Sequence, residues 1–345
     1  MIDFTNSEAL KKIDPQDTVG STDLIAKQFR AAWEDIQTIT IQGDYSSIKN
    51  IVFCGMGASI YGALVLKAIE GCDLPPSELV SDYHLPNYVS TDTLVVLTSY
   101  SGTTEEVLAC AEEAKAKQTK MLILTKGGPL ADFAKTNNIT SYIFDGKFNP
   151  SGVPRHGYGY TILGLLGLFN KARIISLEER ELSDSITRLE EKTPELKKRA
   201  ESDFTRFINH IPVIFTAEHL AANAQILCNQ FNETSKSFSA FYLVPDLNHH
   251  LMEGLQFPKD SQLSFMALQS QNFSLKNKKR MDLTCTVVKN NNQKMYSFDT
   301  AGQTQYDDFF ESIVYGSYLT LYLALYYDQN PAVNPWVDWF KEHLT

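Results

Sequence analysis

SYSGTTEE, residues 99–106, follows the apolar run LVVL at 94–97, with only Thr98 between them. The apolar run is typical of a buried strand, and the residues after it are typical of a helix start. A helix N-terminus presents unpaired backbone N–H groups and the positive end of the helix dipole. Hydroxyl groups there add donors without blocking a phosphate, and Gly102 lets the backbone approach it. The stretch predicts an anion-binding turn, with an ordinary capping turn, in which Thr103 and Glu106 form a capping box, as the alternative.

A second strand-to-helix turn precedes this one, where IVFC at 51–54 leads into GMGAS at 55–59. A Gly-x-Gly after a strand indicates a dinucleotide fingerprint, but Ile60 occupies the third glycine position and weakens that interpretation. The carboxyl ends of parallel strands meet at one edge of a sheet, so both turns can face one ligand. We expect the phosphate to contact Ser59, Ser99, Ser101, Thr103 and Thr104, with the backbone brought close at Gly57 and Gly102.

Composition and charge limit the class of protein. The chain has 345 residues, which suits two domains, and we expect them to span 1–150 and 151–345. A formal net charge of −10 argues against nucleic acid or an anionic membrane as the main partner. Residues 160–169 form the longest apolar stretch, which is too short to span a bilayer, and residues 1–12 lack the apolar core of a signal peptide.

The five cysteines are Cys54, Cys72, Cys110, Cys228 and Cys285. Their odd number and irregular spacing match neither a metal site nor a disulfide framework. We therefore expect buried, reduced thiols in a cytoplasmic protein.

The order of segments in the first half indicates a doubly wound parallel sheet with helices on both faces. After an amphipathic helix at 22–39, strands and helices alternate. The alternating segments are 50–54, 59–70, 77–81, 94–98, 104–117, 120–124, 128–136 and 140–144. Residues 147–154, with two prolines and a glycine, are expected to form a linker.

The second half predicts a further, less regular α/β unit. Helices are expected at 157–174 and 176–207, where the charged residues form a solvated face. A strand at 211–216 leads into a helix at 218–231. Later segments fall at 240–243, 263–268, 282–288 and, as a long helix, 306–327. The strand at 211–216 lacks the Gly-x-Gly turn, because Thr216-Ala217-Glu218 stands there instead.

The two turns resemble the sugar isomerase (SIS) domain, an α/β fold that binds phosphosugars. Further segments are similar to the bifunctional phosphoglucose/phosphomannose isomerase family, and the resemblance runs from about residue 25 to the end. These segments are SGVPRHGYGY at 151–160, FNETSK at 231–236, LNHH at 247–250 followed by Gly254, and the carboxyl end from Asn330-Pro331 to Trp339-Phe340-Lys341.

The resemblance implies two SIS-like doubly wound subdomains and a homodimer whose active site is shared between subunits. It also implies an aldose–ketose isomerase that interconverts glucose 6-phosphate and fructose 6-phosphate. Mannose 6-phosphate is implied as a second aldose substrate. The reaction moves a proton through a cis-enediol, so we expect neither cofactor nor metal. It needs a base, a stabiliser for the developing oxyanion and a group that opens the sugar ring.

Glu233 is the candidate base, because a carboxylate near a helix end has a pKa that burial can raise. A helix-capping or Lys236-paired glutamate is the alternative. Arg155, placed after Pro154, is the candidate stabiliser of an enediolate oxygen. The alternative is an arginine on the surface of a linker.

His249 matches the family's ring-opening histidine, which in that family comes from the partner subunit. The adjacent His250 is the alternative, and a metal-binding histidine pair lacks a supporting carboxylate or cysteine cluster. Lys341 matches the family's C-terminal lysine, placed near the ring oxygen of the sugar. A solvated lysine on the final helix is the alternative for that residue.

The sequence departs from the family pattern at several positions, which leaves the substrate more open than the reaction class. Thr103 replaces a usual Asn, His156 replaces a usually small residue, and His250-Leu251 replaces Asn-Glu after the histidine. The resemblance implies that Asn334 stands at a position that influences how much space the site leaves for the two epimeric aldoses, glucose 6-phosphate and mannose 6-phosphate. The alternatives are an amino-sugar phosphate isomerase, a deglycase that cleaves a sugar-phosphate amine adduct, and a non-catalytic phosphosugar sensor. No DNA-binding helix or basic patch favours the sensor.

Overall fold

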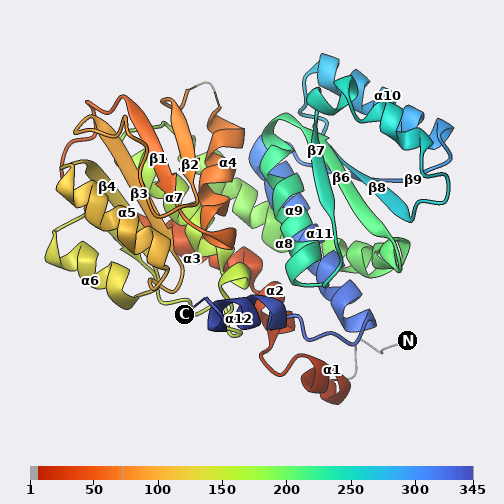
Figure 1. The fold of residues 1–345 in the computed structure, drawn as a ribbon, viewed down its shortest axis with the longest axis horizontal. Coiled ribbons are helices and arrows are strands. Elements are labelled where there is room, and N and C mark those ends of the chain that lie inside the picture. The colour runs from red at the N-terminus through yellow and green to blue at the C-terminus, as the bar shows by residue number, and fades with distance from the viewer. Residues whose placement is uncertain (1–6, 72, 345) are drawn as a thin grey trace. The chain divides into compact units, whose positions relative to one another are not determined.

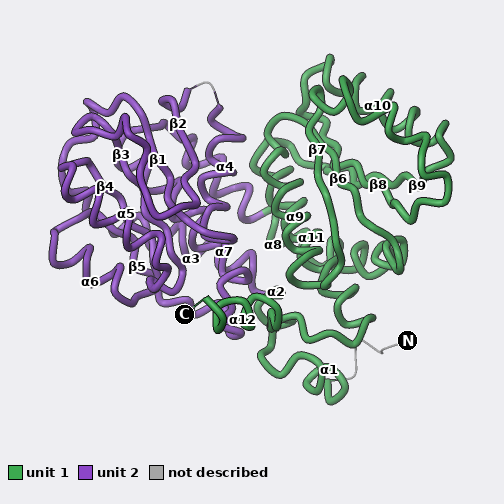
Figure 2. Tube along the Cα trace, in the orientation of Figure 1, with its two compact units in different colours: residues 1–23, 188–345 green, residues 24–187 purple. Residues whose placement is uncertain are grey.

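The computed structural model describes residues 7–71 and 73–344. The chain divides into two compact units, which Figure 2 draws in different colours. Unit 2 comprises residues 24–187, and unit 1 comprises residues 1–23 and 188–345. Each unit is built around its own parallel sheet.

Unit 2 alternates strands and helices as the sequence predicts, and Figure 1 labels its elements. They are α3 Ile25–Thr38, β1 Asn50–Cys54, the 3-10 helix η1 Gly57–Ile60, α4 Tyr61–Glu70, β2 Ser77–Val80, β3 Thr93–Ser99, α5 Glu105–Ala116, β4 Lys120–Thr125, α6 Gly128–Thr136, β5 Ser141–Ile143, the 3-10 helix η2 Pro154–His156 and α7 Tyr158–Lys171. Helix α8 Glu179–Asp203 begins in unit 2 and ends in unit 1.

The sheet of unit 2 has five parallel strands in the order β2-β1-β3-β4-β5. Its central strands β1, β3 and β4 are largely buried on both faces because helices cover both of them. Val52 and Cys54 belong to the core formed with α5 and α6, whereas the Phe53 ring stacks on Phe169 of α7 at 5.8 Å between centroids. Cys54 pairs with Leu97 across β1 and β3, so the two strands end side by side and the turns that follow them start together.

Unit 1 contains the second sheet, with four parallel strands in the order β7-β6-β8-β9. Helices α9 and α11 pack together on one side of this sheet and α10 lies on the other (Figure 1). The elements of unit 1 are α1 Ser7–Ile13, α2 Thr18–Asp23, η3 Phe204–Phe207, β6 Ile211–Ala217, η4 Glu218–Leu220, α9 Ala221–Glu233, β7 Ala240–Val244, η5 Asp246–His249, η6 Met252–Gln256, β8 Leu263–Gln269, α10 Leu275–Asn290, β9 Lys294–Asp299, α11 Gln305–Tyr326 and α12 Pro335–Glu342.

Two parallel sheets flanked by helices confirm the predicted fold class, with differences in detail. Residues 282–288 lie inside helix α10, and strand β9, which has only one fully buried residue, was not predicted from the sequence. The division predicted at residue 150 differs from the compact units, because α7 packs against α3 and α4 within unit 2. Residues 147–154 also lie inside unit 2, where Asn149 is 3% exposed, rather than between the units.

The cysteine prediction holds for the four cysteines that the structure describes. Cys54, Cys110, Cys228 and Cys285 are buried free thiols, and burial raises the pKa of Cys285 to about 11. Cys72 lies outside the described residues. Among the helices of residues 7–71 and 73–344, none combines the length and apolarity needed to cross a membrane.

The turn after β3 is held by close backbone contact with the turn after β4. Gly102 has a φ of +73°, and a Cβ placed there would lie 1.8 Å from the carbonyl oxygen of Gly127. The Gly102 carbonyl also accepts a hydrogen bond from the Leu130 amide at 3.1 Å. Only glycine combines this φ with so close an approach.

We therefore predict that Gly102→Ala lowers the free energy of unfolding by about 2–4 kcal/mol, from backbone strain and overpacking together. Urea unfolding followed by circular dichroism measures the loss. Gly127→Ala is the matched control in the facing turn, because a Cβ there meets nothing within 4 Å. Equal stability of the two variants would contradict the assigned role of Gly102.

Candidate functional site

The hydroxyl-rich turn after β3 leads into helix α5. No side chain of the turn caps the N-terminus of this helix. Thr104 is the N-cap residue, and its side chain makes no capping hydrogen bond. Instead its hydroxyl shares a hydrogen bond of 2.7 Å with Ser99, while Ser101 and Thr103 share one of 2.8 Å. The capping box between Thr103 and Glu106 is therefore not formed. The first N–H groups of α5 remain available to an anion.

The two predicted turns meet at the edge of the sheet. The backbone N–H of Tyr100 donates to Ser59 Oγ at 3.2 Å, which ties the turn after β1 to the turn after β3. Gly57 opens the first turn with a φ of +53° and open space where a Cβ would be. Ser101 and Thr103 are exposed, whereas Ser99 is buried and fixes the Gly102 amide with its Oγ at 3.0 Å. The structure thus brings together all seven residues predicted to surround the phosphate.

Tyr100 connects the turns to the segment that carries Arg155. Its hydroxyl accepts a hydrogen bond from Asn149 Nδ2 at 2.8 Å, and the same Nδ2 donates to the Val153 carbonyl at 2.9 Å. A Cβ on Gly157 would lie 2.2 Å from the Tyr100 ring. Burial raises the pKa of Tyr100, so its phenol stays neutral at pH 7. Tyr100 lies within the stretch that predicted the turn, but its positioning role was not predicted from the sequence.

Arg155 is buried in η2, with 7% of its surface exposed. It is therefore not the surface arginine of the alternative interpretation. Helix η2 contacts η1, which carries Ser59. The neighbouring His156 is also buried, and its carbonyl accepts a hydrogen bond from Gln28 Nε2 at 2.8 Å.

Gln28 is a second positioning residue that was not predicted from the sequence. It lies fully buried in α3, and its Nε2 also donates to the Phe148 carbonyl at 2.9 Å. It therefore fixes both ends of the segment before α7. A signal was present, because Gln28 falls on the apolar stripe of Ile25, Phe29 and Ala32, where a polar side chain needs partners.

Glu233 is the last residue of α9 in unit 1, where a carboxylate near a helix end was predicted. Its side chain is half-buried, and its Oε2 accepts a hydrogen bond from Asn334 Nδ2 at 3.3 Å. Lys236 Nζ donates to the Glu233 backbone carbonyl at 2.7 Å. The structure thus joins Glu233 to Asn334, the position noted for its influence on the epimers.

The two adjacent histidines differ in their surroundings. His250 Nε2 lies 3.4 Å from an Asp246 carboxylate oxygen, and both side chains are exposed. His249 ends η5, is exposed and makes no side-chain hydrogen bond or ion pair within residues 7–71 and 73–344. Asn248 anchors this segment by donating from Nδ2 to Thr284 Oγ1 of α10 at 2.8 Å.

Lys341 lies on the final described helix, α12, which has no buried residue. Asn334 is the N-cap residue of this helix, so Glu233 contacts the start of the element that carries Lys341. The Lys341 side chain itself is exposed, as the alternative interpretation of a solvated lysine also expects.

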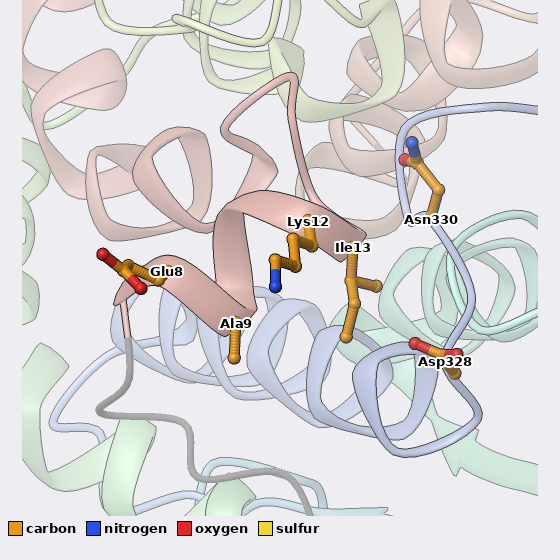
Figure 3. A pocket seen from close by; sticks show the side chains of 6 residues that line it. All are labelled: Glu8, Ala9, Lys12, Ile13, Asp328 and Asn330. Carbon is orange, nitrogen blue, oxygen red and sulfur yellow. The ribbon is translucent and has the colours of Figure 1, made fainter.

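An open cavity of about 650 Å³ lies elsewhere in unit 1 (Figure 3). Helix α1 contributes one side of it and the turn after α11 contributes the other. None of the residues predicted for the site lines it. The lining residues are Glu8, Ala9, Lys12, Ile13, Asp328 and Asn330. In the part of the chain that the structure describes, no three His, Cys, Asp or Glu residues are grouped to hold a metal ion.

Comparison with known proteins defines the class of the chain, a protein with two SIS domains. Residues 44–142 match the SIS domain family model, and residues 196–344 match the bacterial phospho-glucose isomerase C-terminal SIS domain. The crystal structure of a hypothetical protein from Thermus thermophilus shares the fold with a TM-score of 0.71 at 16% identity, covering 97% of this chain and 92% of that one.

Curated relatives define the family. The bifunctional phosphoglucose/phosphomannose isomerase of Caldicellulosiruptor bescii is 31% identical over 93% of this chain and 96% of its own length. The protein of the same name from Aquifex aeolicus is 28% identical, over 90% of this chain and 94% of its own length. The chain belongs to the bifunctional phosphoglucose/phosphomannose isomerase family.

The Tyr100 hydroxyl provides a test of how the site is positioned. We predict that Tyr100→Phe lowers the free energy of unfolding by about 1 kcal/mol, because buried Asn149 loses an acceptor. Urea unfolding measures the loss. Tyr88→Phe is the control, since the Tyr88 hydroxyl bonds Glu78 at the surface and its removal should change stability by less than about 0.5 kcal/mol. Equal losses in both variants would contradict the role assigned to Tyr100.

Proposed function

We propose that this chain interconverts glucose 6-phosphate and fructose 6-phosphate, and accepts mannose 6-phosphate as a second aldose. The observation that carries the proposal is the α5 N-terminus without a side-chain cap, to which the hydroxyl turn and the Ser59 turn both lead. The relatives named as phosphoglucose/phosphomannose isomerases support the same substrate class. Phosphate bound there supplies remote binding energy that positions the reacting carbons.

Each of the predicted catalytic residues has a role in the proposed reaction. Glu233 removes the proton from carbon 2 of the open-chain aldose and returns it to carbon 1. The proton of the carbon 2 hydroxyl moves to the oxygen of carbon 1 as the carbonyl shifts from carbon 1 to carbon 2, so the proton count is unchanged. Its hydrogen bond from Asn334 holds the carboxylate in one orientation. Arg155 stabilises the negative charge on the enediolate oxygen, and its burial strengthens that interaction because water is excluded. No step requires a cofactor or a metal ion.

His249 and Lys341 are proposed to open the sugar ring by moving a proton to and from the ring oxygen. The contact between His250 and Asp246 supports His249 as the acting histidine, because the His249 ring makes no such contact within the described residues. We further propose a homodimer in which His249 serves the site of the partner subunit. A cytoplasmic location fits the four buried free thiols.

Proton exchange tests the proposed reaction directly. With fructose 6-phosphate in heavy water and no added metal, we expect deuterium at carbon 2 of glucose 6-phosphate and of mannose 6-phosphate, observed by NMR. Glu233→Gln should lower kcat about 10²–10⁴-fold, because the base is lost while the shape is kept. Glu253→Gln, an exposed glutamate in η6, is the matched control and should leave kcat unchanged.

The outcomes separate the proposed function from its alternatives. Binding without exchange would identify a phosphosugar sensor. Release of ammonia or amine from an amino-sugar phosphate, without turnover of glucose 6-phosphate, would identify the amino-sugar enzyme or the deglycase. Full turnover by a correctly folded Glu233→Gln variant would show that another residue is the base.

Mixing two inactive variants tests whether His249 acts across subunits. In a hybrid of Glu233→Gln and His249→Ala subunits, one of the two sites regains both wild-type side chains. Random exchange of subunits should therefore restore about a quarter of the wild-type activity. No recovery after subunit exchange, verified by mass spectrometry, would place His249 in the site of its own subunit.

A further inference from the structure

The strand-to-helix turns of unit 1 correspond, residue by residue, to those of unit 2. Thr104 is the N-cap of α5, and Leu97, seven residues before it, pairs with Cys54 of β1. Ser274 is the N-cap of α10, and the residue seven positions before it, Ala267, pairs with Phe215 of β6. The equivalent positions are therefore Thr104 and Ser274, Leu97 and Ala267, and Cys54 and Phe215.

This register places Glu218 where unit 2 has Gly57. Each residue stands three positions after its paired strand residue and opens a 3-10 helix. Each has a left-handed backbone, with a φ of +53° at Gly57 and +49° at Glu218. Glycine adopts this conformation freely, whereas a glutamate there is strained and persists only where its surroundings hold it.

The Glu218 side chain is held at the N-terminus of α10. Its Oε1 accepts hydrogen bonds of 2.6 Å from both Ser274 Oγ and Asn277 Nδ2, and the Ser274 amide donates to the carboxylate at 3.1 Å. Burial by itself raises the pKa of Glu218, but the hydrogen bonds from Ser274 and Asn277 outweigh it and bring the pKa below its ordinary value. The carboxylate therefore lies where a helix of this kind attracts an anion.

A second carboxylate adds negative charge at the same edge of the sheet. Asp308 is fully buried and accepts hydrogen bonds from Ser270 Oγ at 2.5 Å and Asn272 Nδ2 at 2.8 Å, and its Oδ2 lies 3.0 Å from His219 Nε2. In unit 2, hydroxyl groups rather than carboxylates occupy the turn before α5. The turns before α5 and α10 therefore carry different side chains although they share one backbone conformation.

We propose that Glu218 is a built-in anion that fills, in unit 1, the place that the substrate phosphate takes in unit 2. It thereby limits the chain to one phosphosugar site although the fold provides two equivalent turns. The comparison with the phosphate rests on the proposed function, but the occupation of the α10 N-terminus by Glu218 does not.

Replacing Glu218 should open the second position to a free anion. Glu218→Gly removes the carboxylate and suits a φ of +49°, so the turn should keep its shape. We expect equilibrium dialysis with labelled inorganic phosphate, at constant ionic strength, to count one bound phosphate per wild-type chain and two per Glu218→Gly chain. The second phosphate should bind more weakly than the first, because Asp308 remains nearby. It should disappear in the Glu218→Gly/Ser274→Ala double variant, which loses the hydroxyl donor of this turn.

The counts distinguish failure of this inference from failure of the proposed function. An equal count in wild type and Glu218→Gly would overturn the inference and leave the proposed function standing. No phosphate on the wild type and one on Glu218→Gly would support the inference and refute the phosphate assignment of residues 99–104. If Glu218→Gly does not fold by circular dichroism, Glu218→Asn replaces it, because asparagine also tolerates this backbone and carries no charge.

Discussion

The site of unit 2 depends on the contacts of one residue, Tyr100, at the end of β3. Its amide donates to Ser59, its carbonyl accepts from the Lys126 amide, and its hydroxyl accepts from Asn149. Its ring fills the space that a side chain on Gly157 would need. Tyr100 therefore fixes four separate segments of the chain relative to the hydroxyl turn. Together with Gln28, Tyr100 holds the turns and the Arg155 segment in place.

The phosphate site that we propose consists of neutral groups. The N–H groups at the start of α5 and the hydroxyls of Ser101 and Thr103 offer hydrogen bonds without a fixed positive charge. Arg155 is thus left for the charge that develops during the proposed reaction, in a buried position where that charge is poorly screened. The net charge of −10 does not oppose such a site, because local donors outweigh a distant and screened field.

The two units share the same backbone conformation after their first paired strand but carry different side chains there. In unit 2 the left-handed position is Gly57, which has open space where a Cβ would be. In unit 1 the same position is Glu218, whose carboxylate engages Ser274 and Asn277 at the start of α10. The segment that starts with Glu218 continues through η4 and α9 and ends at Glu233. In unit 1, the Glu218 carboxylate thus lies at the N-terminus of α10, and the Glu233 carboxylate lies at the carboxyl end of α9.

The alternation of strands and helices, the two turns and the candidate residues could all be predicted from the sequence. Local patterns suffice for these features, because apolar runs, glycines and hydroxyl clusters act on the neighbouring backbone. Three features became visible only in the folded chain: residues 147–154 belong inside unit 2, Arg155 is buried, and Asn334 contacts Glu233. Those facts depend on contacts between residues far apart in the chain, such as Gln28 with Phe148 and Tyr100 with Asn149, and no local pattern specifies such partners.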